Sequence, residues 1–295
     1  MTLAEIVLQM MNGLTIAAIY ILLASGLTIV LGLQGIVNAA HGVFYMLGAY
    51  LAITLISKIG LNFWLTLPVA FVANFLLGVV LESLGVRTLQ RWKRPSSHQM
   101  ILTIGFALFV IEIIKVIWGT VPQMLAVPPY LQGTISIGSI TYPKYWLFVI
   151  LSTTAFMVIL FLFFNWTGVG TLVRSVAINN EVSQALGTNA PRLNTQIFGL
   201  GTGIAGVAGV LAAPLLGVDT NMGFELLIIL FVVIIFGGLG SLVGVVVSGI
   251  IIGEVMAFGA ALISGMIAKI VVFALMIVIL IIRPLGMFGR GAAIE

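Results

Sequence analysis

Long apolar segments recur along the whole of this 295-residue chain, and they constrain its fold more than any other feature. A helix needs about 20 apolar residues to cross the hydrocarbon core of a bilayer. Runs of about that length fall at residues 6–33, 36–57, 64–86, 98–118, 144–166, 194–216, 225–241, 243–262 and 266–284. A backbone in lipid must satisfy its own hydrogen bonds, so these runs are predicted to be helices. We therefore expect one all-α, polytopic membrane domain over residues 1–295, with about eight or nine transmembrane helices, some broken or rich in glycine.

The composition agrees with a membrane protein and excludes several other classes. Hydrophobic residues make up 61% of the chain and charged residues 7%, whereas about a quarter of the residues in a soluble domain are charged. Cysteine is absent, which excludes disulfides, thiolate catalysis and cysteine-bound metal. The 2 histidines, His41 and His98, and the 8 carboxylates are scattered, so we expect no bound metal. The chain has no stripe of basic and aromatic residues, so we expect no nucleic-acid partner.

Basic residues are grouped in three places, and these groups predict the orientation of the helices. Cytoplasmic loops of membrane proteins carry an excess of lysine and arginine. The groups are Arg87, Arg91, Lys93 and Arg94; Arg174 and Arg192; and Arg283 and Arg290. If every run crosses fully, the C-terminus lies in the cytoplasm and the N-terminus outside. The first residues, MTLAEIVLQMMNG, lack the basic start of a cleaved signal, so we expect the first apolar segment to be retained.

The connection at residues 119–143 is predicted to lie outside the membrane. It holds four of the nine prolines, and its GTISIGSITYP stretch shows the alternation of a small hairpin. Two interpretations are open: a surface on which an external partner docks, and an ordinary connector.

Residues 168–192 form a polar interval between two apolar runs. Val173, Val176, Ala177, Val182, Ala185 and Leu186 fall on one side of a predicted helix, with polar residues on the others. Gly187 and Asn189 are suited to cap that helix, and Pro191 ends it. Such a short exposed helix is either a docking element for a soluble partner or a solvated helix at the membrane surface.

Polar residues stand at the head of the second apolar run, where Asn38 and His41 are followed by Gly42. Glycine permits a break in a helix, and the backbone groups freed by a break need partners. Asn38 and His41 are therefore either hydrogen-bonding groups at a helix end or the lining of an inner pathway or gate.

The glycine-rich stretch FGGLGSLVG at residues 236–244 allows a similar pair of interpretations. Gly240 and Gly244 have the spacing of small residues that let helices pack closely. In the other interpretation, Gly237, Gly238 and Gly240 form a flexible hinge beneath the pathway.

Carboxylates inside a membrane are costly unless they are paired or hydrated. Glu112 and Lys115 are three residues apart and are expected to pair, and Glu82 lies close to Arg87. Glu254 is the exception, because it falls near the middle of its predicted span. It is either a buried structural carboxyl or a group facing the pathway, and Gly249 and Gly253 beside it are expected to leave room for solute or water.

Five segments, in order along the chain, carry a resemblance to a known family. They are NGLTIAAIYILLASGLTIVLGLQGIVNAAHGVFYMLGAY (12–50), WKRPSSHQMILTIGFALFV (92–110), TGVGTLVRSVAINNEVSQALGTNAPRLN (167–194), FGGLGSLVGVVVSGIIIGE (236–254) and RPLGMFGR (283–290). As a set they resemble the permease subunits of the branched-chain (hydrophobic) amino-acid ABC importer family. The chain departs from the family's usual residues at Ala39 or Ala40, Ser175 and Val243, and in carrying its carboxylate at Glu254; these departures leave the substrate open.

The resemblance implies a division of labour among several chains. Such permeases pair with a second related permease, two cytoplasmic ATPases drive them, and an external substrate-binding protein feeds them, all at the bacterial inner membrane. It also implies that residues 168–192 couple to an ATPase, with Ala177, Ala185 and Gly187 seated in its cleft and Arg174 and Glu181 fixing the register.

The chain itself is then not an enzyme and binds no cofactor. No lysine follows a glycine anywhere, so the phosphate loop GxxxxGK is absent, and ATP with its magnesium would belong to the partner ATPases. The expected cargo is a branched-chain or other small apolar amino acid. Urea, amides or nucleosides are alternative cargoes within the family, and an ion-coupled carrier or an intramembrane enzyme are alternatives outside it.

Overall fold

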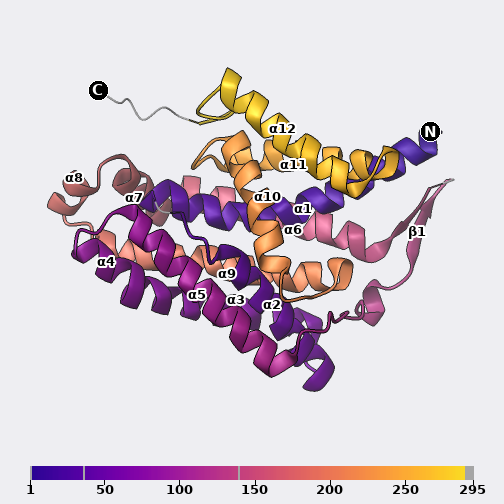
Figure 1. Ribbon diagram of the computed structural model, residues 1–295, viewed down its shortest axis with the longest axis horizontal. Coiled ribbons are helices and arrows are strands. Elements are labelled where there is room, and N and C mark those ends of the chain that lie inside the picture. The colour runs from indigo at the N-terminus through magenta and orange to yellow at the C-terminus, as the bar shows by residue number, and fades with distance from the viewer. Residues whose placement is uncertain (1, 36, 139, 290–295) are drawn as a thin grey trace. The chain divides into compact units, whose positions relative to one another are not determined.

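The computed structural model describes residues 2–35, 37–138 and 140–289, and Figure 1 shows it as a ribbon. The chain forms two compact units. The first contains residues 1–24, 126–158 and 228–295, and the second contains residues 25–125 and 159–227. Arg290, one of the basic residues used to predict orientation, lies outside the described residues.

All nine predicted apolar runs are helical. The helices are α1 (Leu3–Gln34), α2 (His41–Ile53), α3 (Phe63–Leu81), α5 (Ser96–Trp118), α6 (Lys144–Trp166), α9 (Ala190–Leu216), α10 (Met222–Gly237), α11 (Leu242–Leu262) and α12 (Gly265–Ile282). The π-helical turn η1 (Thr54–Lys58) continues α2, and the π-helical turn η2 (Glu82–Val86) joins α3 to α4 (Arg87–Arg91). The main difference from the prediction is that the second helix begins at His41 rather than at residue 36.

Helix length separates the helices that are suited to cross a membrane from the shorter ones. Among the described residues, 7 helices are long and apolar enough to cross, with α3, η2 and α4 counted together as Phe63–Arg91. Two shorter apolar helices are Gly168–Ile178 and Met222–Gly237. The chain is therefore an all-α, polytopic membrane protein, as the sequence predicts, but seven helices of the described residues have spanning length rather than the expected eight or nine.

Helix α2 is at the centre of the second unit, where it packs against α3, α5 and α9 (Figure 1). Most of its residues are buried, including Tyr45 and Tyr50. The backbones come very close, since a methyl group at Gly48 would overlap the carbonyl group of Gly206 in α9. Small residues allow such close contact in lipid, where helix association depends on packing.

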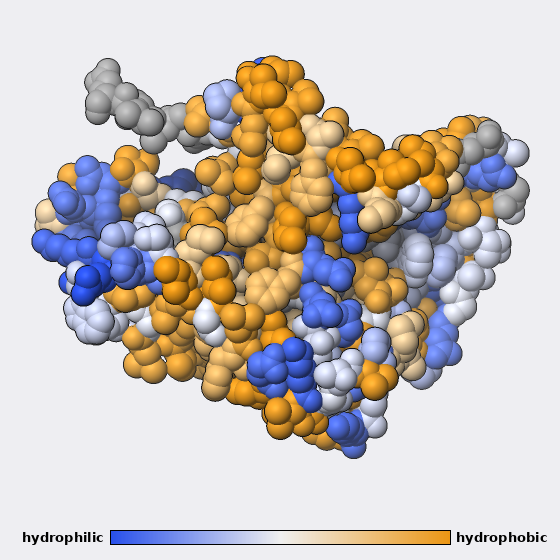
Figure 2. All heavy atoms as spheres, viewed as in Figure 1, coloured by the Kyte–Doolittle hydropathy of each residue, from blue (hydrophilic) through white to orange (hydrophobic). Residues whose placement is uncertain are grey.

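In the first unit, α11 packs on the amino-terminal part of α1 through two glycines. Gly249 lies against Ile21, and Gly253 lies against Ala17 and the backbone of Gly13. Helix α12 follows a serine cap at Ser264 and buries few of its own side chains. Apolar residues cover it (Figure 2), as expected for a helix that faces lipid.

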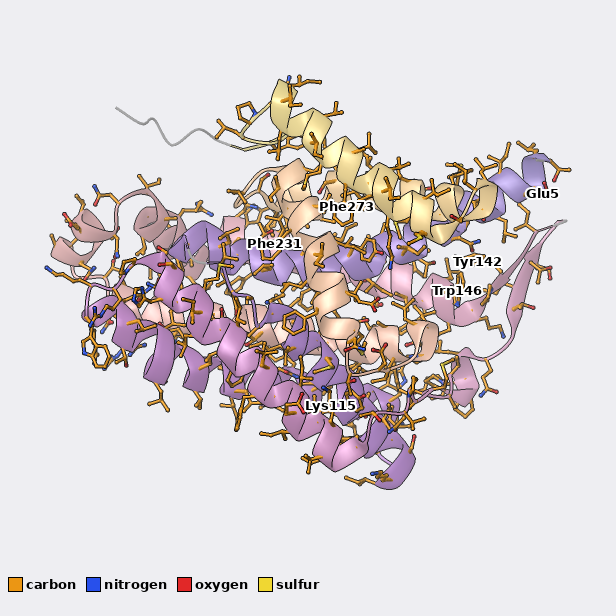
Figure 3. The ribbon with its side chains drawn as sticks, in the orientation of Figure 1. Glu5, Lys115, Tyr142, Trp146, Phe231 and Phe273 are labelled. Carbon is orange, nitrogen blue, oxygen red and sulfur yellow. The ribbon has the colours of Figure 1, made fainter. Side chains whose placement is uncertain are left out.

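The predicted hairpin is confirmed in the connection between α5 and α6. Strands β1 (Thr134–Ile137) and β2 (Ile140–Pro143) pair antiparallel, with Ile135 opposite Tyr142, and follow the short 3-10 helix η3 (Pro129–Leu131). The Tyr142 hydroxyl donates to the carbonyl oxygen of Met11 at 2.7 Å and lies 2.7 Å from Oγ1 of Thr15. Its ring meets that of Trp146 edge-on (Figure 3). Burial raises the pKa of Tyr142, so the phenol stays a donor at neutral pH.

Replacing Tyr142 with phenylalanine tests whether this phenol holds the hairpin to α1. We expect Tyr142→Phe to destabilise the protein by about 1 kcal/mol, because it removes the hydrogen bond to the partly buried Met11 carbonyl, which keeps the bond from Oγ1 of Thr15 at 3.1 Å. The measurement is the melting temperature in detergent. Ser136→Ala on the exposed face of β1 is the control and should leave it unchanged. An unchanged melting temperature in Tyr142→Phe would contradict the assignment.

Candidate functional site

Residues 168–192 fold as two short helices rather than the single predicted helix. These are α7 (Gly168–Ile178) and α8 (Asn180–Ala185). Asn179 separates them in an extended conformation and caps α8, its side chain accepting a hydrogen bond from the backbone of Val182 at 3.0 Å. Asparagine is a favoured capping residue, and its side chain competes with the helical backbone. The break changes which side chains of the segment face solvent.

Helix α7 is fixed to the end of α6. Val173 and Val176 are buried, and a methyl group at Gly170 would overlap the carbonyl group of Phe164. Arg174 donates to that same carbonyl oxygen, and its other terminal nitrogen bonds to Oγ1 of Thr171 at 3.3 Å. Arg174 therefore holds α7 in place within the chain, and its predicted contact with an ATPase stays a prediction.

Six side chains around the break are exposed, and we call this set of residues the coupling face. It consists of Ala177, Ile178, Glu181, Val182, Ala185 and Leu186. Ile178 is 87% exposed and Leu186 is 82% exposed. The sequence pattern places Val182 and Leu186 on the same side as Val173 and Val176, and it does not single out Ile178. An exposed apolar patch with a polar rim marks an interaction surface.

The segment ends in defined caps, and its surroundings are polar. Gly187 has φ +93°, a left-handed conformation that favours glycine, and it follows the end of α8. Asn189 then caps α9 by accepting from the backbone of Arg192 at 3.1 Å. Hydrophilic residues gather over α8 and α4 in Figure 2. The predicted coupling residues Ala177, Glu181, Ala185 and Gly187 are thus all exposed at this end of the second unit.

The part of the break next to α2 is enclosed by protein, whereas Gly35 at its start is exposed. Asn38 and His41 are both 0% exposed. Oδ1 of Asn38 accepts from the backbone of Ala40 at 3.0 Å, and the backbone of Ala39 donates to Oγ1 of Thr103 at 3.2 Å. Asn38 thus provides the predicted hydrogen bond at the helix end. A role of Asn38 or His41 in the pathway stays a prediction.

The next residue, Gly42, lies against the backbone of Gly223 near the start of α10. A methyl group at Gly42 would come within 2.8 Å of the Gly223 carbonyl carbon. The first turns of α2 and α10 therefore touch without intervening side chains, and this juncture belongs to the second unit.

The glycines at 237–240 form the tight turn between α10 and α11. Gly238 and Gly240 have φ +103° and +78°, which explains the need for glycine there. The close contact joins Gly237 to Gly244 across the turn. The backbone amide of Phe288 donates to the carbonyl oxygen of Gly237 at 2.9 Å, so the C-terminal segment also holds this turn. Whether the turn acts as a hinge stays a prediction.

Glu254 lies on the side of α11 that faces α1, in the first unit. Its carboxyl carbon would be 2.5 Å from a methyl group built on Gly13, so only glycine fits opposite it without displacement. Oε2 is buried and has no hydrogen-bond partner among the described residues, while the residue as a whole is partly exposed. The expectation that Gly249 and Gly253 leave room for solute is wrong, because Ile21 and Ala17 of α1 fill those positions.

The predicted pairing of Glu112 with Lys115 is confirmed. Nζ of Lys115 lies 2.7 Å from Oε1 of Glu112 at the end of α5. Glu82 and Arg87 also form an ion pair, at 3.4 Å.

The fold defines a multi-pass membrane protein, and comparison with known proteins assigns its family. The family model described as "Branched-chain amino acid transport system / permease component" matches residues 9–280. The chain belongs to this family. It is 32% identical over 299 residues to the high-affinity branched-chain amino acid transport system permease protein BraD of Pseudomonas aeruginosa, covering 96% of this chain and 95% of BraD.

Two further similarities are more limited. A stretch of 68 residues is 44% identical to the permease protein LivM of Escherichia coli, covering 22% of this chain and 16% of LivM. Among solved structures, the chain is similar to PsaBC from Streptococcus pneumoniae in complex with Fab, with a TM-score of 0.49 and 14% identity, covering 90% of this chain and 89% of that one.

Glu254 can be tested together with the glycine it faces. Glu254→Gln keeps the size of the side chain and breaks no ion pair among the described residues, so we expect an unchanged melting temperature. If Glu254 faces the pathway, loss of its charge should reduce leucine uptake by cells. Gly13→Ala, which must displace the same carboxyl group, should reduce uptake in the same direction. Gly105→Ala, where a methyl group meets nothing within 4 Å, is the control. Uptake by Glu254→Gln equal to wild type at every pH would remove the pathway role.

Proposed function

We propose that this chain is the permease subunit of an ATP-driven importer that moves branched-chain or other small apolar amino acids into the cell. The observation that carries the proposal is the family match over residues 9–280, together with the end-to-end similarity to BraD. A neutral zwitterion needs no ring of charged side chains, which agrees with the low charge of the predicted spans. The charged residues within those predicted spans are Glu82, Glu112, Lys115, Lys144, Glu225, Glu254, Lys269 and Arg283.

A second, related permease completes the translocation pathway in this proposal. The similarity of a short stretch to LivM supports it, because two permeases of one family can pair around a shared route. An external substrate-binding protein delivers the amino acid to the outer side, where the hairpin β1–β2 offers a docking surface.

Two cytoplasmic ATPases hydrolyse ATP with magnesium and act on the permeases through the coupling face. The sequence supports this division because it has no GxxxxGK phosphate loop. The exposure of Ile178, Val182 and Leu186 supports it as well, since these apolar side chains gain by burial against a partner. This chain itself binds no cofactor in the proposal.

The proposed orientation places the coupling face in the cytoplasm and the N-terminus outside the bacterial inner membrane. Arg87 bonds to Pro191, so the basic loop after α3 and the end of residues 168–192 lie at the same end of the second unit. Both carry arginine, and this agrees with the excess of basic residues on cytoplasmic faces.

The dependence on ATP is tested by reconstitution. We expect this chain alone in liposomes to give no uphill uptake of leucine, and the complex purified with its partner subunits to give uptake that requires ATP. The measurement is accumulation of radiolabelled leucine, with the complex and no ATP as the control. Uphill uptake by the chain alone, driven by a proton or sodium gradient, would contradict the proposal.

The coupling face is tested by a bulky substitution at its centre. Ala185→Trp should reduce co-purification of the ATPases and abolish the stimulation of ATP hydrolysis by substrate, because the indole ring blocks close approach. Ala185→Ser, which keeps the size of the side chain, is the matched control and should behave as wild type. Normal assembly and stimulation in Ala185→Trp would show that this face is only a solvated surface.

A further inference from the structure

An ion pair between the buried Glu82 and the partly exposed Arg87 lies in the second unit, beside the end of the coupling segment. Glu82 is 0% exposed, and its Oε2 lies 3.4 Å from Nη2 of Arg87. Oε2 also accepts a hydrogen bond from Oγ1 of Thr195, in the first turns of α9. Nη2 of Arg87 contacts Thr195 as well and donates to the carbonyl oxygen of Pro191 at 2.9 Å. We call Glu82, Arg87, Thr195 and Pro191 the α3–α9 clamp.

The backbone is locally shaped to make this pair. In an α-helix, side chains three and four residues apart are neighbours, whereas Glu82 and Arg87 are five apart. The π-helical turn η2 spans Glu82–Val86, and the backbone amide of Arg87 donates to the carbonyl oxygen of Glu82. This wider turn brings residues five apart onto the same side of the helix. Such turns are rare and are frequent at functional sites.

Stability alone is a weak reason for a buried ion pair. Removing two charges from water is costly, and well-packed apolar side chains in their place are often at least as stable. The arginine provides geometry instead, because one terminal nitrogen of its guanidinium group, Nη2, contacts three oxygens at once. Here the arginine spans from its own helix to two residues of α9.

The clamp lies where the coupling segment joins the membrane helices. Pro191 follows Asn189, the cap of α9, and is five residues beyond Leu186 of the coupling face. The other end of the segment is held separately, by the bond from Arg174 to Phe164. Beyond the clamp, α3 and α9 stay in contact, with Oγ1 of Thr202 donating to the carbonyl oxygen of Asn74 at 3.0 Å. A displacement of the segment at Pro191 therefore reaches both helices together.

We propose that Arg87 is a positioning residue that, with Glu82, transmits displacement of the coupling face to α3 and α9. The inference rests on the proposed function, since it assumes that an ATPase moves the coupling face. It adds a specific link between that surface and the transport helices, made by side chains that do not belong to the coupling segment.

The test compares variants in the complex purified by a tag on this chain and reconstituted in liposomes. The measured quantity is leucine transported per ATP hydrolysed, with the yield of co-purified ATPase and the melting temperature measured in parallel. Glu82→Gln/Arg87→Gln removes both charges at once and leaves no unpaired ion. We expect it to assemble normally and to transport about 10-fold less leucine per ATP, within the usual range of coupling between sites.

Two further variants keep the test decisive. Arg94→Gln removes an exposed arginine from the loop that follows the same short helix and should match wild type. Arg87→Lys keeps the charge but its nitrogen ends one bond short of the position of Nη2, so its coupling should also fall, and it carries the test if the double variant does not assemble. Wild-type coupling in the double variant, or in Arg87→Lys where the double variant fails to assemble, would overturn the role of the clamp.

The same preparation separates this inference from the proposed function. If wild type takes up leucine in an ATP-dependent manner and the variants couple equally well, only the clamp role fails. If wild type itself co-purifies with no ATPase or shows no ATP-dependent uptake of leucine, the proposed function fails and the clamp role with it.

Discussion

The structure depends on one constraint, that hydrocarbon offers no partner to a backbone amide or carbonyl group. Helices satisfy it along the apolar runs, and backbone groups freed where a helix is interrupted can bond to side chains of the protein. The break before α2 shows this most clearly. Backbone amides at Ala39 and Ala40 bond to Thr103 and Asn38, and α2 itself is surrounded by other helices. An irregular backbone at that position requires a second layer of helices around it, and α3, α5 and α9 provide that layer.

Glycine makes this enclosure possible, because it lets backbones touch where side chains would keep them apart. Gly48 against Gly206 in the second unit and Gly253 against α1 in the first are contacts of the same kind. Such contacts gain dispersion energy from many atoms at close range. They also leave few side-chain positions for chemistry, so the polar groups that remain in the helices are informative. The presence of a polar side chain in these helices needs an explanation that the apolar residues do not need. Such side chains belong to Asn74, Thr202, Glu82 and Glu254.

The sequence predicts most of the fold because the signals that set it are local. Run length locates the nine helices, and alternation locates the hairpin. It predicts the site less well, because tertiary contacts decide the remaining features. The capping bond of Asn179 divides one predicted helix into two and exposes Ile178. The packing of α1 on α11 fills the space expected beside Glu254. The pairing of Glu82 with Arg87 across a π-helical turn has a spacing that an α-helical pattern does not suggest.

Two of the carboxylates inside predicted spans, Glu82 and Glu254, illustrate how the environment of a group separates a structural role from a role in transport. Glu82 has a cation and a hydroxyl group as partners. Arg87 balances its charge, and its Oε2 contacts both Arg87 and Thr195. Glu254 has no ion pair among the described residues, and a glycine faces it. Each of the two has one buried oxygen without a hydrogen bond, Oε1 in Glu82 and Oε2 in Glu254. A carboxylate with partners inside the protein suits a rigid link, since breaking its contacts leaves a buried charge. A carboxylate without such a partner suits contact with water or a passing ammonium group, because it loses no protein partner when it binds. On the proposed function, Glu82 therefore belongs with the helices that move as a body, and Glu254 with the surfaces past which the amino acid moves.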